Sequence, residues 1–260
     1  MPKSRSYQSE AIIIKKIKLG EADRILTFYT PKLGKIQGVA KGVRRPRSKL
    51  AGHLELLNYS QISLASGRNL DTITGSQTLD AFLPMRTDLW LTSCGLYIAE
   101  LVSQFAADQD ENESLFRLLQ NTLQLLCRED NNVELLLRYF EIHLLNEVGY
   151  RPELKQCASC HAQFKPVTNF FSPPAGGVIC PKCVKSRSLT YPISVNSLKV
   201  LRFLQDNSYE TASKLKLNQG LFRELDELLS HYLEYLLERG VKSAAWLNVL
   251  REQAKQGELV

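Results

Sequence analysis

The hydrophobic pattern of the chain changes near residue 81. Before this point, branched and aromatic residues occur in short runs that end at glycine, proline or other turn formers. These runs predict five strands, at residues 11–14, 24–30, 35–40, 54–64 and 70–79. Five short strands fit a small closed barrel of the oligonucleotide-binding (OB) type, although an SH3-like barrel would give a similar pattern.

Beyond Pro84, apolar residues recur every three or four positions, which is the period of an α-helix. Asn131 or Asn132 is suited to cap the third of these helices, and Gly149 to end it. We expect the helices to pack into one helical domain, formed by residues 81–148 and 190–260. The apolar stripes cover residues 87–107, 115–126, 136–148, 198–204, 219–238 and 244–250.

Between the two helical stretches lie two C-x-x-C pairs separated by nineteen residues, formed by Cys157, Cys160, Cys180 and Cys183. This spacing is typical of a four-cysteine zinc site, and two disulfides or four ordinary thiols are the alternative. Four thiolates fill the tetrahedral shell of zinc and leave no position for a reacting water. We therefore predict one structural zinc ion in a module over residues 149–189. His161 could replace a cysteine, but we expect it on the surface of the turn.

Charge is distributed unevenly along the 260 residues, whose net charge is +6. Residues 1–80 have a net charge of +8, residues 81–150 of −7, residues 151–190 of +5, and the remainder is balanced. The basic N-terminal part is suited to meet phosphate groups, whereas the acidic helical part is not.

The densest basic stretch, at residues 41–49, has five Lys or Arg among nine residues. Gly42 and Pro46 make it a loop of the barrel. A cationic loop on a small barrel suits contact with a nucleic-acid backbone, and a merely solvated loop is the alternative. Phe28, Tyr29 and Tyr59 could stack on bases, although each also suits the core. The candidate DNA-binding residues are Lys35, Lys41, Arg44, Arg45, Arg47 and Lys49.

No catalytic motif emerges from the sequence. It lacks a Walker-type loop and a G-x-S-x-G elbow. The zinc-deaminase signature also fails, because His161-Ala-Gln163 lacks the glutamate that shuttles protons and Ile179 replaces the proline before Cys180. Cys94 and Cys127 lie in apolar helical stretches and read as inert thiols. We therefore expect a binding protein and not an enzyme.

The N-terminus lacks the apolar core of a signal peptide, and no apolar run reaches the length of a membrane span. These features predict a cytoplasmic protein whose thiols stay reduced.

Several motifs together resemble the RecO family of bacterial DNA repair proteins and recombination mediators. The first is Gly20–Thr30, followed by Gly34-Lys-Ile and by the segment from Val39 to Arg45. Gly149-Tyr-Arg-Pro152 and the cysteine block complete the resemblance. One departure is His161, where the family commonly has a glycine; we expect some strain there and intact metal ligation.

The resemblance implies a multidomain α+β protein. Its parts would be an OB-fold barrel over residues 1–80, the helical domain and the inserted zinc module. Family members bind single- and double-stranded DNA, anneal complementary strands and help to load RecA onto strands coated by the single-stranded-DNA-binding protein (SSB). They work with RecR and with the acidic tail of SSB. The resemblance thus implies a non-enzymatic, nucleoid-associated mediator; a zinc-ribbon scaffold without DNA binding is the alternative, and a metal hydrolase or deaminase is disfavoured by the filled metal shell.

Overall fold

The computed structural model describes residues 6–186 and 188–256, which form two compact units. The first unit contains the described residues up to Glu129 and those from Val241 onward. The second unit contains the described residues of Asp130–Gly240. The domain ranges expected from the sequence stay a prediction, since compact units and domains need not coincide.

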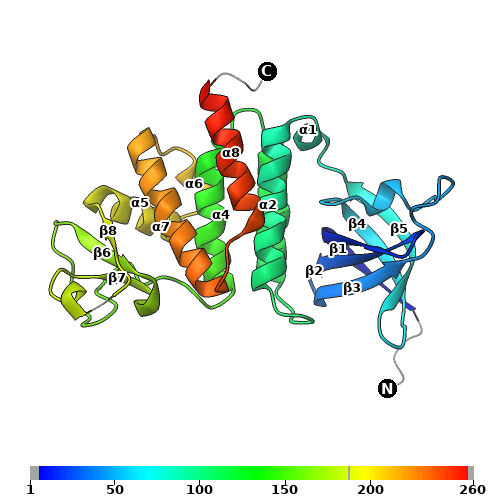
Figure 1. The fold of residues 1–260 in the computed structure, drawn as a ribbon, viewed down its shortest axis with the longest axis horizontal. Coiled ribbons are helices and arrows are strands. Elements are labelled where there is room, and N and C mark those ends of the chain that lie inside the picture. Colours follow the sequence, from blue (N-terminus) through cyan, green and yellow to red (C-terminus); the bar gives the residue numbers. More distant parts are fainter. Residues whose placement is uncertain (1–5, 187, 257–260) are drawn as a thin grey trace. The chain divides into compact units, whose positions relative to one another are not determined.

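A closed five-stranded barrel begins the first unit (Figure 1). Its strands follow one another in the order β1-β2-β3-β5-β4, and β1 closes the barrel by pairing with both β2 and β4. All pairs are antiparallel except the short β3–β5 pair. This topology confirms the predicted OB-type barrel. The strands are β1 (Ser6–Leu19), β2 (Asp23–Thr30), β3 (Gly34–Ala40), β4 (Tyr59–Ala65) and β5 (Asp71–Asp80).

The inward-facing side chains of these strands fill the barrel. Ile13, Leu26, Phe28, Ile62 and Leu64 are fully buried in one cluster. Each such side chain contributes about 1.5–3 kcal/mol through the burial of apolar surface. A bulge between Ile13 and Lys15 shifts the β1–β2 register, and such bulges bend a strand around a barrel.

Two strand predictions were wrong at their ends. β1 extends over Ser6–Leu19, well beyond residues 11–14, because its polar ends pair with β2 and β4 although they lack an apolar run. The predicted strand at 54–64 begins only at Tyr59. The residues before it form the turn η1 (Gly52–Leu54) and a loop in which Leu57 has a φ of 67°. Leu54 and Leu57 are buried without belonging to a strand, so their apolar character was mistaken for strand periodicity.

Helices α1 (Leu83–Arg86), α2 (Leu89–Phe105), α3 (Glu113–Leu126) and α8 (Lys242–Gln256) complete the first unit. The carboxylate of Asp88 caps α2, and the side-chain amide of Asn112 caps α3. Gly95 allows α2 to approach its neighbours, because a Cβ atom there would lie 2.7 Å from the sulfur of Met85. The short helix α1 has too few residues to show a periodic stripe.

The second unit combines four helices with a three-stranded sheet of order β7-β6-β8. Asn132 caps α4, which is one of the two caps predicted for this helix, and Ser194 caps α5. The sheet and α6 were not predicted, because elements of three or four residues give no readable period. The elements are α4 (Val133–Glu147), β6 (Asn169–Ser172), β7 (Gly177–Ile179), β8 (Tyr191–Ile193), α5 (Val195–Asp206), α6 (Tyr209–Ala212) and α7 (Gln219–Leu237), with the short turns η2 (Pro173–Ala175) and η3 (Val184–Ser186).

Across the described residues, no helix combines the length and the apolar character that a membrane crossing requires. The fold therefore confirms the expected class: an OB-type barrel followed by helices, with a four-cysteine cluster placed among the helical segments.

Candidate nucleic-acid interface and metal centre

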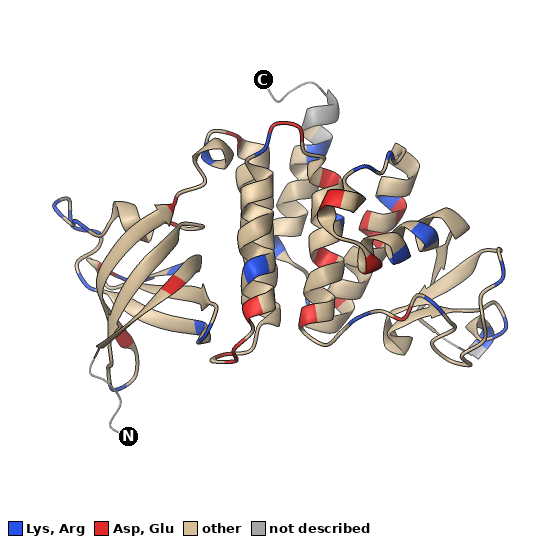
Figure 2. Ribbon diagram, turned by 180° about the vertical axis from the view of Figure 1, so that it is seen from behind, with Lys and Arg blue, Asp and Glu red and all other residues tan. Residues whose placement is uncertain are grey.

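The basic loop follows β3 and projects from the barrel (Figure 2). Its base is pinned to the β1–β2 turn: the backbone N–H of Gly42 donates to Asp23 Oδ1 at 2.7 Å, and that of Arg44 donates to the carbonyl oxygen of Ala22 at 2.9 Å. Val43 is only 2 % exposed and inserts into the barrel core. The loop is therefore anchored at its base while its outer part stays in solvent.

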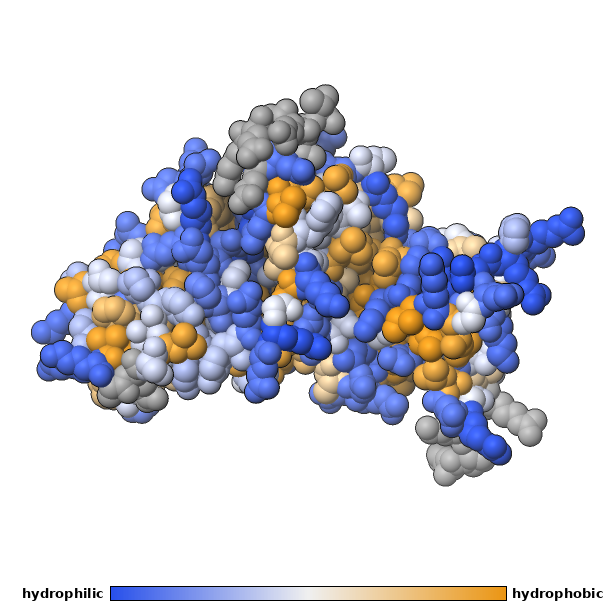
Figure 3. All heavy atoms as spheres, viewed as in Figure 1, coloured by the Kyte–Doolittle hydropathy of each residue, from blue (hydrophilic) through white to orange (hydrophobic). Residues whose placement is uncertain are grey.

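Five of the six candidate DNA-binding residues are exposed on this loop: Lys41, Arg44, Arg45, Arg47 and Lys49. None forms a salt bridge with a described Asp or Glu. One Nη of Arg44 donates to the carbonyl oxygen of Gly20 at 3.2 Å, which leaves most of its guanidinium donors available. In the space-filling view the loop stands out as a hydrophilic projection from the barrel (Figure 3).

Lys35, the sixth candidate, lies apart from the loop. It is near the start of β3, whereas the loop follows the end of that strand, about 20 Å away at 3.3 Å per residue. Its ammonium donates to the carbonyl oxygen of Ser103 at 2.9 Å and lies 3.2 Å from Asp108 Oδ1. The structure therefore brings five of the candidates together and gives Lys35 partners within the protein.

The aromatic residues considered for base stacking lie in the protein interior or at its edge. Phe28 and Tyr29 are at most 1 % exposed. Tyr59 is half-buried, and its hydroxyl donates to Glu10 Oε2 at 2.6 Å. Burial and this hydrogen bond to Glu10 raise the pKa of Tyr59 to about 12. Phe28 and Tyr29 thus belong to the core and offer no exposed ring for base stacking.

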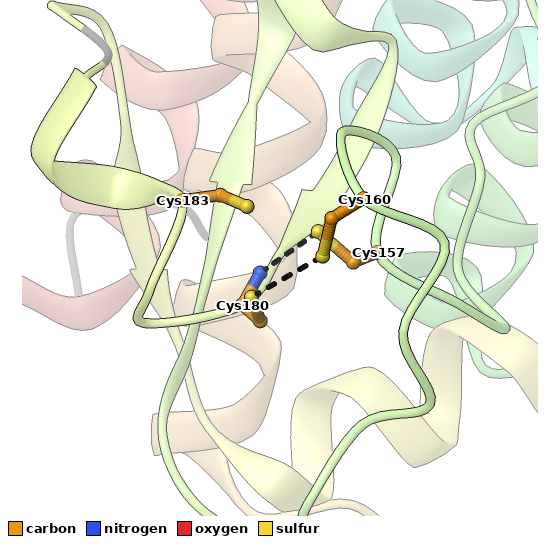
Figure 4. A group of neighbouring side chains, drawn as sticks. All are labelled: Cys157, Cys160, Cys180 and Cys183. Atoms are coloured by element: carbon orange, nitrogen blue, oxygen red, sulfur yellow. Dashed lines mark hydrogen bonds between the residues drawn. The ribbon is translucent and has the colours of Figure 1, made fainter.

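The four cysteines of the two C-x-x-C pairs converge in the second unit (Figure 4). All four Sγ atoms lie within 4.8 Å of one another. Cys157 is buried, Cys160 is exposed, and Cys180 and Cys183 are intermediate. This arrangement offers four sulfur ligands to one metal ion, and none of the four cysteines forms a disulfide.

Backbone turns aim the thiols inward. The N–H of His161 donates to the carbonyl oxygen of Cys157 at 2.8 Å, and that of Cys183 to the carbonyl oxygen of Cys180 at 2.9 Å. The N–H of Cys180 donates to Cys157 Sγ at 3.3 Å. Burial raises the pKa of the Cys157 thiol, but the backbone groups of Cys160, Cys180 and Ser159 outweigh it and lower the pKa to about 6. Such backbone donors stabilise the thiolate, which is the form that binds metal.

His161 has a φ of 59° and an exposed side chain. A left-handed conformation is uncommon for a residue other than glycine, and histidine is among those that tolerate it. His161 thus lies on the turn surface, as expected, and it occupies a backbone conformation that favours glycine. Intact metal ligation beside it stays a prediction.

The other two cysteines lie in the first unit. Cys94 is fully buried in α2. Burial raises the pKa of the Cys127 thiol, which donates to the carbonyl oxygen of Leu123. Burial and a raised pKa both disfavour the reactive thiolate, and the inert role of the two cysteines stays a prediction.

Sequence reasoning missed a buried ionic cluster in the second unit. Arg138 and Glu141 on α4 are 2 % and 0 % exposed, and an Nη of Arg138 donates to Glu141 Oε1 at 2.6 Å. A second Nη donates to Asp226 of α7. The signal was an i, i+3 pair of opposite charges inside an otherwise apolar helix. Its partner on α7 could not be read from the sequence.

The class of protein is defined by an OB-type barrel with a cationic loop, followed by helices and by four clustered cysteines that could hold a metal ion. Comparison with known proteins gives the family. Residues 3–82 match the family model described as Recombination protein O N terminal, and residues 86–245 match Recombination protein O C terminal. The chain therefore belongs to the RecO family of DNA repair proteins.

Relatives over nearly the whole chain agree with this assignment. The chain is 46% identical over 251 residues to the DNA repair protein RecO of Dehalococcoides mccartyi (strain CBDB1), covering 96% of this chain and 98% of the relative. It is 41% identical over 253 residues to the DNA repair protein RecO of Roseiflexus sp. (strain RS-1), covering 97% and 89%. It is 32% identical over 247 residues to the protein of the same name in Symbiobacterium thermophilum, covering 94% and 98%. The printed names describe DNA repair and state no catalytic activity.

Proposed function

We propose that this chain is a DNA-binding recombination mediator that performs no bond-making chemistry. It binds single- and double-stranded DNA, anneals complementary strands, and assists the loading of RecA onto SSB-coated DNA, in contact with RecR and the SSB tail. It acts in the bacterial cytoplasm at the nucleoid. The observation that carries the proposal is the anchored loop with five exposed cations, Lys41, Arg44, Arg45, Arg47 and Lys49.

The loop supports this proposal through simple electrostatics. Each Lys or Arg that neutralises a phosphate releases condensed counterions, so binding is salt-dependent and nearly independent of base sequence. Holding two strands against one cationic surface also reduces their mutual repulsion, which favours annealing. Because Val43 and Gly42 tie the base of the loop to the barrel, little of the loop needs to be ordered on binding.

We propose that the metal of the four-cysteine centre is zinc, in a structural role. A tetrahedral zinc with Zn–S bonds of about 2.3 Å places its sulfurs about 3.8 Å apart. The Sγ atoms of Cys160 and Cys180 are 3.8 Å apart. With four thiolates in the shell, the ion braces the cysteine turns against the sheet and has no site for substrate.

The test is the binding of a fluorescently labelled, unstructured single-stranded oligonucleotide, followed by anisotropy at about 50 and 200 mM salt. We expect tight binding at low salt and a loss of affinity of about tenfold or more at high salt, as for several phosphate contacts. Annealing of two complementary oligonucleotides should accelerate under the same conditions. Absence of binding even at low salt would refute DNA binding and favour a scaffold that acts through protein contacts.

A further inference from the structure

The second unit contains a cavity of about 330 Å³ that the DNA-binding proposal does not use. It lies where β8 and the cap of α5 meet α7. Tyr191 and His231 line it together with Ser194, Glu224, Glu227 and Leu228. Pockets for small molecules occupy about 300–1,000 Å³. This cavity is at the small end of that range and suits a single side chain.

One part of the wall is a pair of stacked rings. The ring centroids of Tyr191 and His231 are 4.0 Å apart, and the ring planes differ by only 5°. Stacking holds both rings in place, so the cavity has a preformed aromatic wall. His231 Nδ1 is buried and has no hydrogen-bond partner among the described residues.

The charges of the lining are acidic. Both carboxylate oxygens of Glu224 accept from Ser194, one from its backbone N–H at 2.6 Å and the other from its hydroxyl at 2.9 Å. Glu227 lies one turn further along α7, is exposed, and forms no salt bridge with a described Lys or Arg. The lining includes no Lys or Arg, so the carboxylates of Glu224 and Glu227 give the cavity an acidic character.

We propose that this cavity is a docking site for an arginine side chain of a partner protein. A guanidinium is planar and stacks beside aromatic rings, and it carries several N–H donors. One edge of it can donate to the exposed Glu227 carboxylate while its planar face lies beside the Tyr191–His231 ring pair. Lysine offers a compact ammonium, which cannot lie flat along the aromatic wall and donate two parallel hydrogen bonds to one carboxylate. The site goes beyond DNA binding, since it would fix a protein partner on the second unit.

The test is an NMR titration of the full-length chain, labelled at histidine and tyrosine rings, with Nα-acetyl-argininamide as the probe. We expect saturable shifts of the His231 and Tyr191 ring signals. Glu227→Gln keeps the volume of the side chain and removes its charge, and it should weaken binding roughly three- to tenfold. Glu234→Gln is the matched control, because Glu234 is exposed on the same helix and does not line the cavity.

Three outcomes would overturn the proposal. The first is unmoved His231 and Tyr191 signals at saturating probe, and the second is equal binding by the wild type and Glu227→Gln. The third is an equal response to Nα-acetyl-lysinamide, which would show general attraction of cations and not recognition of a guanidinium. Glu227 is exposed, so its substitution should leave the thermal midpoint unchanged; the ring shifts therefore report on the site and not on the folding of the variant.

Discussion

The ammonium of Lys35 on β3 lies 3.2 Å from the carboxylate of Asp108, in the loop between α2 and α3. The same loop continues the barrel sheet, since the backbone N–H of Gln109 donates to the carbonyl oxygen of Lys35 at 3.0 Å. Gly34 is required there, because a Cβ atom would lie 2.0 Å from the carbonyl oxygen of Asp110. Lys35 thus connects β3 to the end of α2 and to the loop that follows it, within the first unit.

Replacing Lys35 by methionine should lower the free energy of unfolding by about 1 kcal/mol, because the carbonyl of Ser103 at the end of α2 loses its cationic donor. Urea denaturation measures this change. Lys32→Met is the control, since Lys32 is exposed and should cost less than about 0.5 kcal/mol. We expect Lys35→Met to weaken DNA binding less than loop substitutions do. A larger loss of DNA affinity than of stability would contradict this view.

The double variant Arg44→Ala, Arg45→Ala should weaken the binding of single-stranded DNA. Two lost phosphate contacts should reduce the slope of log K against log salt by about 1.4. The measurement is an anisotropy titration at several salt concentrations. The matched control is Lys214→Ala, Lys216→Ala, which removes the same charge from exposed positions of the second unit. If both double variants change the slope equally, net charge and not the loop controls binding.

Cys157→Ser should abolish stoichiometric metal binding and destabilise the second unit by at least about 3 kcal/mol, since metal affinity is coupled to folding. Elemental analysis and thermal unfolding measure the two effects, and a chelator should reproduce them in the wild type. Cys127→Ser serves as the control, because its hydroxyl can keep the bond to Leu123 while the metal ligands remain intact. Unchanged thermal stability after complete metal removal would disprove the structural role.

Arg138→Met should destabilise the second unit by about 3–5 kcal/mol, because it leaves the fully buried carboxylate of Glu141 without its cation. Chemical denaturation measures the loss. Adding Glu141→Leu should recover part of it, since no uncompensated charge then remains in the core. Arg117→Met breaks an exposed pair with Glu113 and should cost less than about 1 kcal/mol. Similar losses for Arg138 and Arg117 would show that burial does not determine the cost.

The sequence was most informative where chemistry is local. The two C-x-x-C pairs predicted the thiol cluster, because the geometry of each pair is set within four residues and one ion needs both pairs. The glycine-like position of His161 was expected from the resemblance to the RecO family, which commonly has a glycine there. The five strands were found because branched residues alternate with turns, although both ends of β1 were missed where pairing and not apolar character defines the strand.

Tertiary structure alone decided which basic side chains pair within the protein and which stay exposed to solvent. Lys35 and Arg44 look equivalent in the sequence, yet only the fold places one beside Asp108 and leaves the other on an exposed loop. Arg138 and Asp226 are 88 positions apart, so nothing local could pair them. The same is true of Tyr191 and His231, which stack only because β8 packs against α7. The sequence by itself determined the longer helices, the barrel strands and the four cysteines that cluster, because these depend on short-range geometry. The burial of a side chain and its ion-pair partners depend on contacts between distant segments. Such contacts exist only once the chain is folded.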